Sequence, residues 1–134
     1  MNLVLGNIEP NAHYDMAHGM PTNIERDNDG SYLFRYNIKE EYATTDQDGN
    51  TMDEPVQTGW SCVEIRMWEK PNHSNVKREI IRSQIDECEE FAIVNKYNMN
   101  VLGVHLDDDA VARYKAYLQF TLDIDTMLAT VFTD

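Results

Sequence analysis

The stretch "IDECEEFAIVNKYN", residues 85–98, decides how the C-terminal half folds, because it gathers four carboxylates around a single cysteine. Such a cluster is either a site for chemistry or the beginning of a helix. Asp86 followed by Glu89 fits a capping box in which aspartate replaces serine or threonine. The other carboxylates fall in the first turn, near the positive end of the helix dipole. The pattern predicts a helix that begins at Asp86, and it leaves Cys88 as a surface or half-buried residue without a chemical role.

A shorter helix is predicted just before this one. Pro71 ends the preceding strand, and Asn72, Ser74 or Asn75 can cap the segment that follows. Within "NVKREIIRSQI" three aliphatic side chains form a short apolar stripe. These signals predict a helix between Pro71 and Ile85.

The C-terminal stretch "HLDDDAVARYKAYLQFTLDIDTMLATVF" predicts a further helix, with residues 107–109 as its cap and negative first turn. Its apolar side chains follow two stripes rather than one. A helix that is apolar on two sides has more hydrophobic surface than a small sheet can cover, which favours a partner chain or a subunit interface. A compact helical core is the alternative. The interface candidates on this helix are Phe120, Ile124, Met127, Leu128, Val131 and Phe132.

An antiparallel β-ribbon is predicted upstream of the helices. In "SYLFRYNIKEEY", residues 31–42, aromatic and aliphatic side chains alternate with others at period two, which is typical of a half-buried strand. The stretch "GWSCVEIRMWEK", residues 59–70, alternates in the same way. Between them, the polar residues 43–58 contain Asp48-Gly49 as a turn signal, and we expect a long exposed loop there.

Two tryptophans of this ribbon are further interface candidates. Trp60 and Trp68 are eight residues apart, so they lie on one face of the predicted strand. Tryptophans on the wetter face of a ribbon suit interface anchoring or sugar stacking. The alternative is that the helices pack on this face and bury both side chains.

The first 30 residues show no sustained period. Their segment "EPNAHYDMAHGMPTN" is broken by Pro10, Gly19 and Pro21. We expect an irregular arm that lies over the domain or over a neighbouring subunit. The predicted organisation is an N-terminal arm, residues 1–30, and a single α+β domain, residues 31–134. In that domain an antiparallel β-ribbon packs against about three helices.

The charge of the chain limits its partners. Of 134 residues, 24 are acidic and 11 are basic, for a net charge of −13. This balance opposes direct binding of nucleic acid, which needs lysine and arginine to displace counterions. A membrane partner is not expected either, because no run of about 18 apolar residues occurs, and the first residues lack the basic leader of a signal peptide. Cys62 and Cys88 are expected to be reduced, as in the cytoplasm.

No metal site is predicted in the acidic turn. Asp46, Asp48 and Asn50 are spaced like the opening of an EF-hand loop. However, the sixth position of that loop holds Thr51 instead of glycine, and the twelfth holds Gln57 instead of glutamate. The segment is therefore expected to be a turn rather than a calcium site.

No catalytic residue and no cofactor are predicted. A zinc site could be assembled from His13, Asp15 and His18 only in space, because histidines five residues apart do not share one helical face. The sequence contains no Gly-rich phosphate loop and no nucleophile elbow of the GxSxG type. We therefore expect a protein that is not an enzyme.

Three segments carry a resemblance to a known group of proteins. The order "GWSCVEIRMWEKP", "VKREIIRSQIDECEEFAIVNKYN" and "ARYKAYLQF" resembles small proteins encoded in phages and prophages of gut bacteria, commonly among tail and virion assembly genes. The resemblance covers about residues 57–120, and its motifs are helix caps and core positions. It does not extend to residues 1–30, 43–56 and 121–132. It implies a structural or assembly role and no catalytic residue.

Two functions follow as expectations. The first is a non-enzymatic phage virion or tail protein that acts through protein–protein contacts with copies of itself or with other phage structural proteins. It would be located in the virion, and in the host cytoplasm during assembly. The alternative is a small acidic inhibitor that mimics nucleic acid and binds the basic cleft of a host enzyme. Such a mimic needs its carboxylates along one continuous face.

Overall fold

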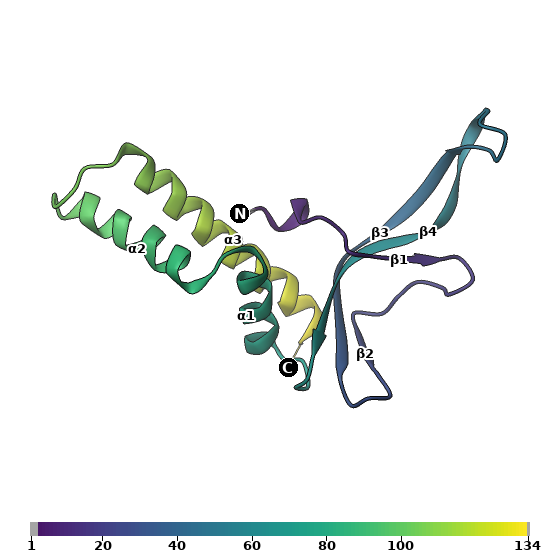
Figure 1. The fold of residues 1–134 in the computed structure, drawn as a ribbon, viewed down its shortest axis with the longest axis horizontal. Coiled ribbons are helices and arrows are strands. Elements are labelled where there is room, and N and C mark those ends of the chain that lie inside the picture. Colours follow the sequence, from purple (N-terminus) through teal and green to yellow (C-terminus); the bar gives the residue numbers. More distant parts are fainter. Residues whose placement is uncertain (1–2, 134) are drawn as a thin grey trace. The chain divides into compact units, whose positions relative to one another are not determined.

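The computed structural model describes residues 3–133 and shows an α+β protein with a four-stranded antiparallel sheet and three α-helices (Figure 1). This confirms the predicted fold class. The chain divides into two compact units, which we call the sheet unit (residues 9–71) and the helical unit (residues 3–8 with 72–133). In chain order the elements are η1 (Leu5–Asn7), β1 (Ala12–Asp15), β2 (Ile24–Arg26), β3 (Tyr32–Thr45), β4 (Thr51–Met67), α1 (His73–Gln84), α2 (Glu87–Val101) and α3 (Asp108–Val131).

Two short segments of the predicted N-terminal arm pair with the sheet, while its other described residues outside η1 are irregular. The strand order is β1-β4-β3-β2, so both short N-terminal strands form the edges. β1 pairs with β4 from Ala12 opposite Cys62 to Asp15 opposite Gly59, and β2 pairs with the start of β3. Short polar edge strands are held by backbone hydrogen bonds and carry little periodicity, which is why their sequence looks irregular. The chain therefore divides near residues 9 and 71, and not at residue 30.

The long loop predicted over residues 43–58 is wrong. β3 and β4 continue as a paired hairpin far beyond the other two strands, and only residues 46–50 form the turn (Figure 1). The turn does use the Asp48-Gly49 signal, with Gly49 at a φ of 84°. Pro55 is tolerated because the register shifts between Ala43 and Thr45, where the ladder lacks regular partners.

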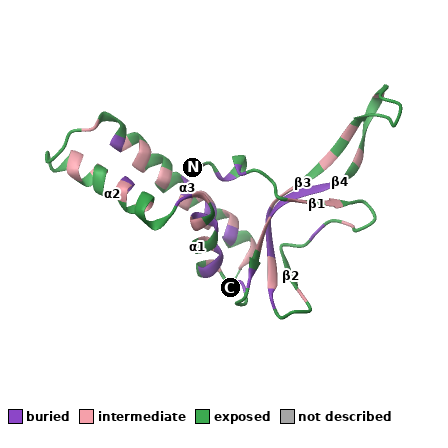
Figure 2. Ribbon diagram, in the orientation of Figure 1, coloured by how far each residue is buried: buried purple, intermediate pink, exposed green. Residues whose placement is uncertain are grey.

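The core of the sheet unit lies along the middle of β3 and β4 (Figure 2). Phe34, Tyr36 and Cys62 are almost fully buried there. The two candidate tryptophans differ, since Trp60 is 9% exposed and Trp68, just beyond the end of β4, is 70% exposed. Trp60 is therefore a core residue and not an interface anchor, and only Trp68 stays available for a contact.

In the helical unit all three predicted N-caps are confirmed, but at Asp86 the return bond from the Glu89 side chain that would complete a capping box is absent. The Asp86 side chain accepts a hydrogen bond from the backbone N–H of Glu89 at 2.8 Å and begins α2. Asn72 begins α1 in a reciprocal capping box with Asn75, and Asp107 begins α3. The carboxylates of the opening stretch thus have a structural explanation, and Cys88 is exposed.

α3 is the central element of the helical unit. It contacts η1, α1 and α2, and Figure 1 shows α2 beside its N-terminal half and α1 beside its C-terminal half. Phe120, Ile124 and Leu128 have no exposed surface. Three of the six interface candidates on α3 are therefore core residues, because positions 120, 124 and 128 share one helical face. The other three, Met127, Val131 and Phe132, are half-buried.

Candidate interaction surface

The side of α3 opposite its core stripe carries exposed leucines. Leu118 is 45% exposed and Leu122 is 57% exposed. They are four residues apart, so they are neighbours on one helical face. The prediction of a helix that is apolar on two sides is thus confirmed in part, since one side is buried in the unit and the other faces outward.

A second apolar surface lies where α2 turns into α3. We call residues 101–106, "VLGVHL", the apolar tip. Its four aliphatic side chains are all exposed by more than half: Val101 60%, Leu102 76%, Val104 71% and Leu106 77%.

The apolar tip is an ordered turn. Gly103 has a φ of 72°, Val104 N–H donates to the Met99 carbonyl at 2.9 Å, and Gly103 N–H donates to the Asn100 carbonyl at 3.3 Å. This is the Schellman arrangement that ends many helices. The motif holds apolar side chains outward in a defined geometry, which suits a contact surface.

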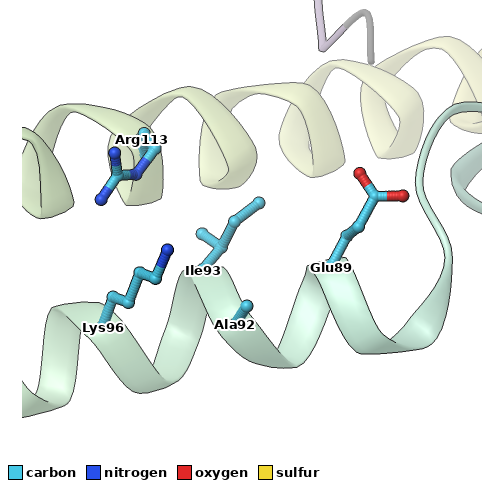
Figure 3. Close-up of a pocket in the computed structure, with 5 residues that line it drawn as sticks. All are labelled: Glu89, Ala92, Ile93, Lys96 and Arg113. Atoms are coloured by element: carbon cyan, nitrogen blue, oxygen red, sulfur yellow. The ribbon is translucent and has the colours of Figure 1, made fainter.

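Between α2 and α3 lies a shallow groove with a cavity volume of about 180 Å³. Figure 3 shows Ile93 at its centre, with Glu89 and Lys96 on either side of it along α2 and Arg113 opposite on α3. Arg113 donates to the Asp107 carboxylate at 2.6 Å, which lowers the pKa of that carboxyl group. One carboxylate, Glu89, and two cations line the groove, and one of these cations, Arg113, is paired with Asp107.

A second groove, which we call the α1 groove, has a cavity volume of about 260 Å³. Two of its cations are held by carboxylates of the same unit. Lys77 donates to Asp125 at 2.8 Å, and Arg82 donates to Glu90 at 2.9 Å. Its lining residues are Ser74, Lys77, Arg78, Ile81, Arg82 and Glu90.

These ion pairs shift the pKa of the carboxyl groups that take part in them. His73 and Lys77 both bond to Asp125 and lower the pKa of its carboxyl group. Burial raises the pKa of Glu90, but the hydrogen bonds from Tyr117 and Arg82 lower that pKa by more, so the net shift is downward. Both acids stay charged at neutral pH, and they anchor the cations of α1 to α3 and α2.

The sheet unit contains one buried cation. Arg35 on β3 is 1% exposed, and its Nε donates to Glu64 at 2.9 Å and to the Tyr14 hydroxyl at 3.1 Å. The Tyr14 hydroxyl also donates to Glu64, and Glu25 on β2 lies 3.4 Å from the guanidinium. The cluster joins all four strands, so its geometry indicates a structural role.

The end of the β3–β4 hairpin, residues 40–58, is strongly acidic, and we call it the acidic hairpin. It contains six carboxylates and no lysine or arginine. Asp46 is occupied by the turn, since its side chain accepts from the backbone N–H groups of Asp48 and Asn50. The side chains of Asp48, Asp53 and Glu54 make no hydrogen bond or ion pair within the described chain.

The structure does not assemble the histidines into a metal site. His13 bonds to Glu41 at 2.9 Å, and the backbone N–H of His18 bonds to Asp15. Over residues 3–133, no group of three or more metal-binding side chains converges. The apolar tip and the α1 groove were missed in the sequence; the run of aliphatic residues around Gly103 was the available signal for the first.

Comparison of the chain with family models, curated proteins and solved structures finds no match. Among the described helices, none is both long and apolar enough to cross a membrane.

Proposed function

We propose that this protein is a non-enzymatic structural or assembly protein that acts by contact with other proteins. The observation that carries the proposal is the apolar tip, in which Val101, Leu102, Val104 and Leu106 are all more than half exposed. Burial of each such side chain contributes roughly 1.5–3 kcal/mol. Four of them, held by an ordered turn, provide the apolar centre of a protein interface.

The exposed leucines of α3 extend the proposed contact along the helical unit. Leu118 and Leu122 lie on the outward side of α3, the helix that follows the apolar tip in the chain. The resemblance of residues 57–120 to phage and prophage proteins suggests the setting, a virion or tail. The partners would be copies of this chain or other phage structural proteins.

The proposal is tested by replacing two tip residues. Leu102→Gln with Leu106→Gln should leave the fold intact, because both side chains are exposed, and should abolish association with copies or virion proteins. Sedimentation measures self-association, and mass spectrometry of purified particles measures incorporation. A double variant that associates and is incorporated like the wild type would show that the apolar tip has no part in these contacts.

The acidic hairpin favours a second candidate, an inhibitor that mimics nucleic acid. Its six carboxylates lie on a two-stranded hairpin that contains no lysine or arginine. Such an inhibitor would bind a basic cleft in a salt-sensitive way. Tight, salt-sensitive binding to a host nucleic-acid enzyme, lost in Asp53→Lys with Glu54→Lys, would establish this candidate. Unchanged binding in that variant would remove it.

A further inference from the structure

We propose that the α1 groove is a carboxylate-binding site, and that its occupant is the acidic hairpin of a second copy of this chain. This rests on the proposed function in one respect, since it names a partner and adds a second, electrostatic contact to the apolar one.

The charge of α1 is opposite to that of the whole chain. Residues 73–84 contain Lys77, Arg78 and Arg82 against the single acid Glu79, while the whole chain has a net charge of −13. The three cations all line the α1 groove. A cationic groove on an anionic protein attracts anionic segments, and every copy of this chain carries one.

One guanidinium group in the groove, that of Arg78, retains its donors for a ligand. Arg78 is exposed and makes no hydrogen bond or ion pair within the described residues. Arg82 uses Nη2 for Glu90, while its Nη1 is buried and has no partner among the described residues. A carboxylate accepts two parallel bonds from such a planar fork, which makes arginine well suited to bind it.

The carboxylate that lines the groove is already neutralised. Glu90 accepts from Arg82 at 2.9 Å and from the Tyr117 hydroxyl at 2.6 Å. Lys77 is balanced by Asp125 at 2.8 Å. The remaining uncompensated charge is that of Arg78, beside the apolar side chain of Ile81, so the groove fits an anionic segment with some apolar surface.

The acidic hairpin has this chemistry. The carboxylates of Asp48, Asp53 and Glu54 are unpaired within the described chain, and Val56 beside them is 55% exposed. The hairpin extends beyond β1 and β2, so these groups can reach a neighbouring molecule (Figure 1). A groove on one copy and a hairpin on the next form a head-to-tail contact, which builds closed rings or open filaments.

The test is a charge reversal measured by sedimentation over a range of protein concentrations. Arg78→Glu should raise the dissociation constant for self-association by about tenfold or more. Asp53→Lys with Glu54→Lys should do the same. A mixture of the two proteins should recover association, because the native groove of one variant meets the native acidic hairpin of the other, and the reversed groove meets the reversed hairpin. Association of the wild type should also weaken between about 0.05 and 0.5 M NaCl.

Lys115→Glu is the matched control. Lys115 is exposed on α3 of the same unit, makes no hydrogen bond or ion pair within the described chain, and does not line the groove. Its reversal changes the net charge as much as Arg78→Glu does, but it lies outside the groove, so it should leave association unchanged. Equal weakening by both reversals, or a mixture that fails to recover, would overturn the assignment of the groove. A wild-type chain that stays monomeric would overturn it as well.

The outcomes separate this inference from the proposed function. Association that is lost in the tip variant and kept in Arg78→Glu leaves the proposed function standing and removes the groove contact. The opposite result is association that depends on Arg78 and on salt and is unchanged in the tip variant, in a protein that is absent from particles. That result would support the groove contact and remove the proposed function. Melting temperatures of all variants should match the wild type, since the substituted side chains are exposed.

Discussion

At the scale of single residues, Arg35 is the buried charge on which the sheet depends. Its guanidinium is satisfied mainly by Glu64, Tyr14 and the Thr22 carbonyl oxygen. Removing one partner of a buried ion pair leaves an uncompensated charge in a poorly solvated place. We therefore expect Glu64→Gln to lower the free energy of unfolding of the sheet unit by about 3 kcal/mol, measured by chemical denaturation. Glu54→Gln, an unpaired exposed acid, is the control and should be silent.

The same pair makes stability depend on pH. Burial raises the pKa of Glu64, but hydrogen bonds from Tyr14 and Arg35 lower it more, so its pKa in the folded state is below the ordinary value. The stabilisation is fully present above the unfolded-state pKa, about pH 4.3, and is lost as pH falls through the folded-state pKa. In Glu64→Gln this part of the acid destabilisation should be absent. An identical pH dependence in variant and wild type would show that other carboxylates cause it.

A further prediction at this scale concerns the opening stretch. Asp86 satisfies the N–H of Glu89 at the start of α2, so Asp86→Ala should cost about 1 kcal/mol of stability. It should leave partner binding intact, because Asp86 lies outside the apolar tip and the α1 groove. Cys88→Ser is the control and should change neither quantity. Loss of an activity with unchanged stability would show that the acidic residues around Cys88 form a chemical site and not only a helix cap.

At the scale of elements, Gly59 lets β1 approach β4. A Cβ added at this position would lie 1.9 Å from the Tyr14 carbonyl oxygen, a backbone atom that cannot move without β1. Gly59→Ala should therefore displace β1 and expose its amides to hydrogen exchange, while the turn at residues 46–50 stays intact. Gly6→Ala, where an added Cβ meets nothing within 4 Å, is the control. Protected β1 amides in Gly59→Ala would mean that the strands can slide to make room.

The elements also show what the sequence can predict. All three helix starts were predictable, because Asn72, Asp86 and Asp107 bond to backbone groups two or three residues away. β1 and β2 were not. The partner of β1 is distant in the chain, since Ala12 lies opposite Cys62, and β2 pairs with the nearby β3 but is only three residues long. A four-residue polar strand pairs through its backbone, which every residue type shares, so its side chains carry little signal.

The candidate surfaces were harder to predict than the elements. Periodicity identified two apolar stripes on α3, but which one the unit buries depends on where α1 and α2 contact it. The structure buries Phe120, Ile124 and Leu128 and leaves Leu118 and Leu122 outward. The α1 groove depends on ion pairs between helices: Lys77 bonds to Asp125 on α3, and Arg82 bonds to Glu90 on α2. Spacing along one helix contains no such information.

At the scale of the whole molecule, changes to the C-terminal residues test whether these residues are needed for folding or for association. Removing residues 121–134 deletes Ile124 and Leu128, which have no exposed surface, and Asp125, which bonds to His73 and Lys77 of α1. Each buried side chain contributes roughly 1.5–3 kcal/mol, and typical domains are stable by only about 5–15 kcal/mol. We expect the truncated chain to lose the helical unit, seen as lost α1 and α2 signal in circular dichroism and hydrogen exchange.

A surface change on the same helix should have the opposite effect. Leu118→Gln with Leu122→Gln replaces two exposed side chains, so the helical unit should melt at the wild-type temperature while association weakens. If the truncated chain instead keeps α1 and α2 folded and loses only association, then Ile124 and Leu128 are contact residues, as the sequence pattern first suggested. Because Ile124 and Leu128 are buried within the helical unit, we expect that their removal unfolds this unit.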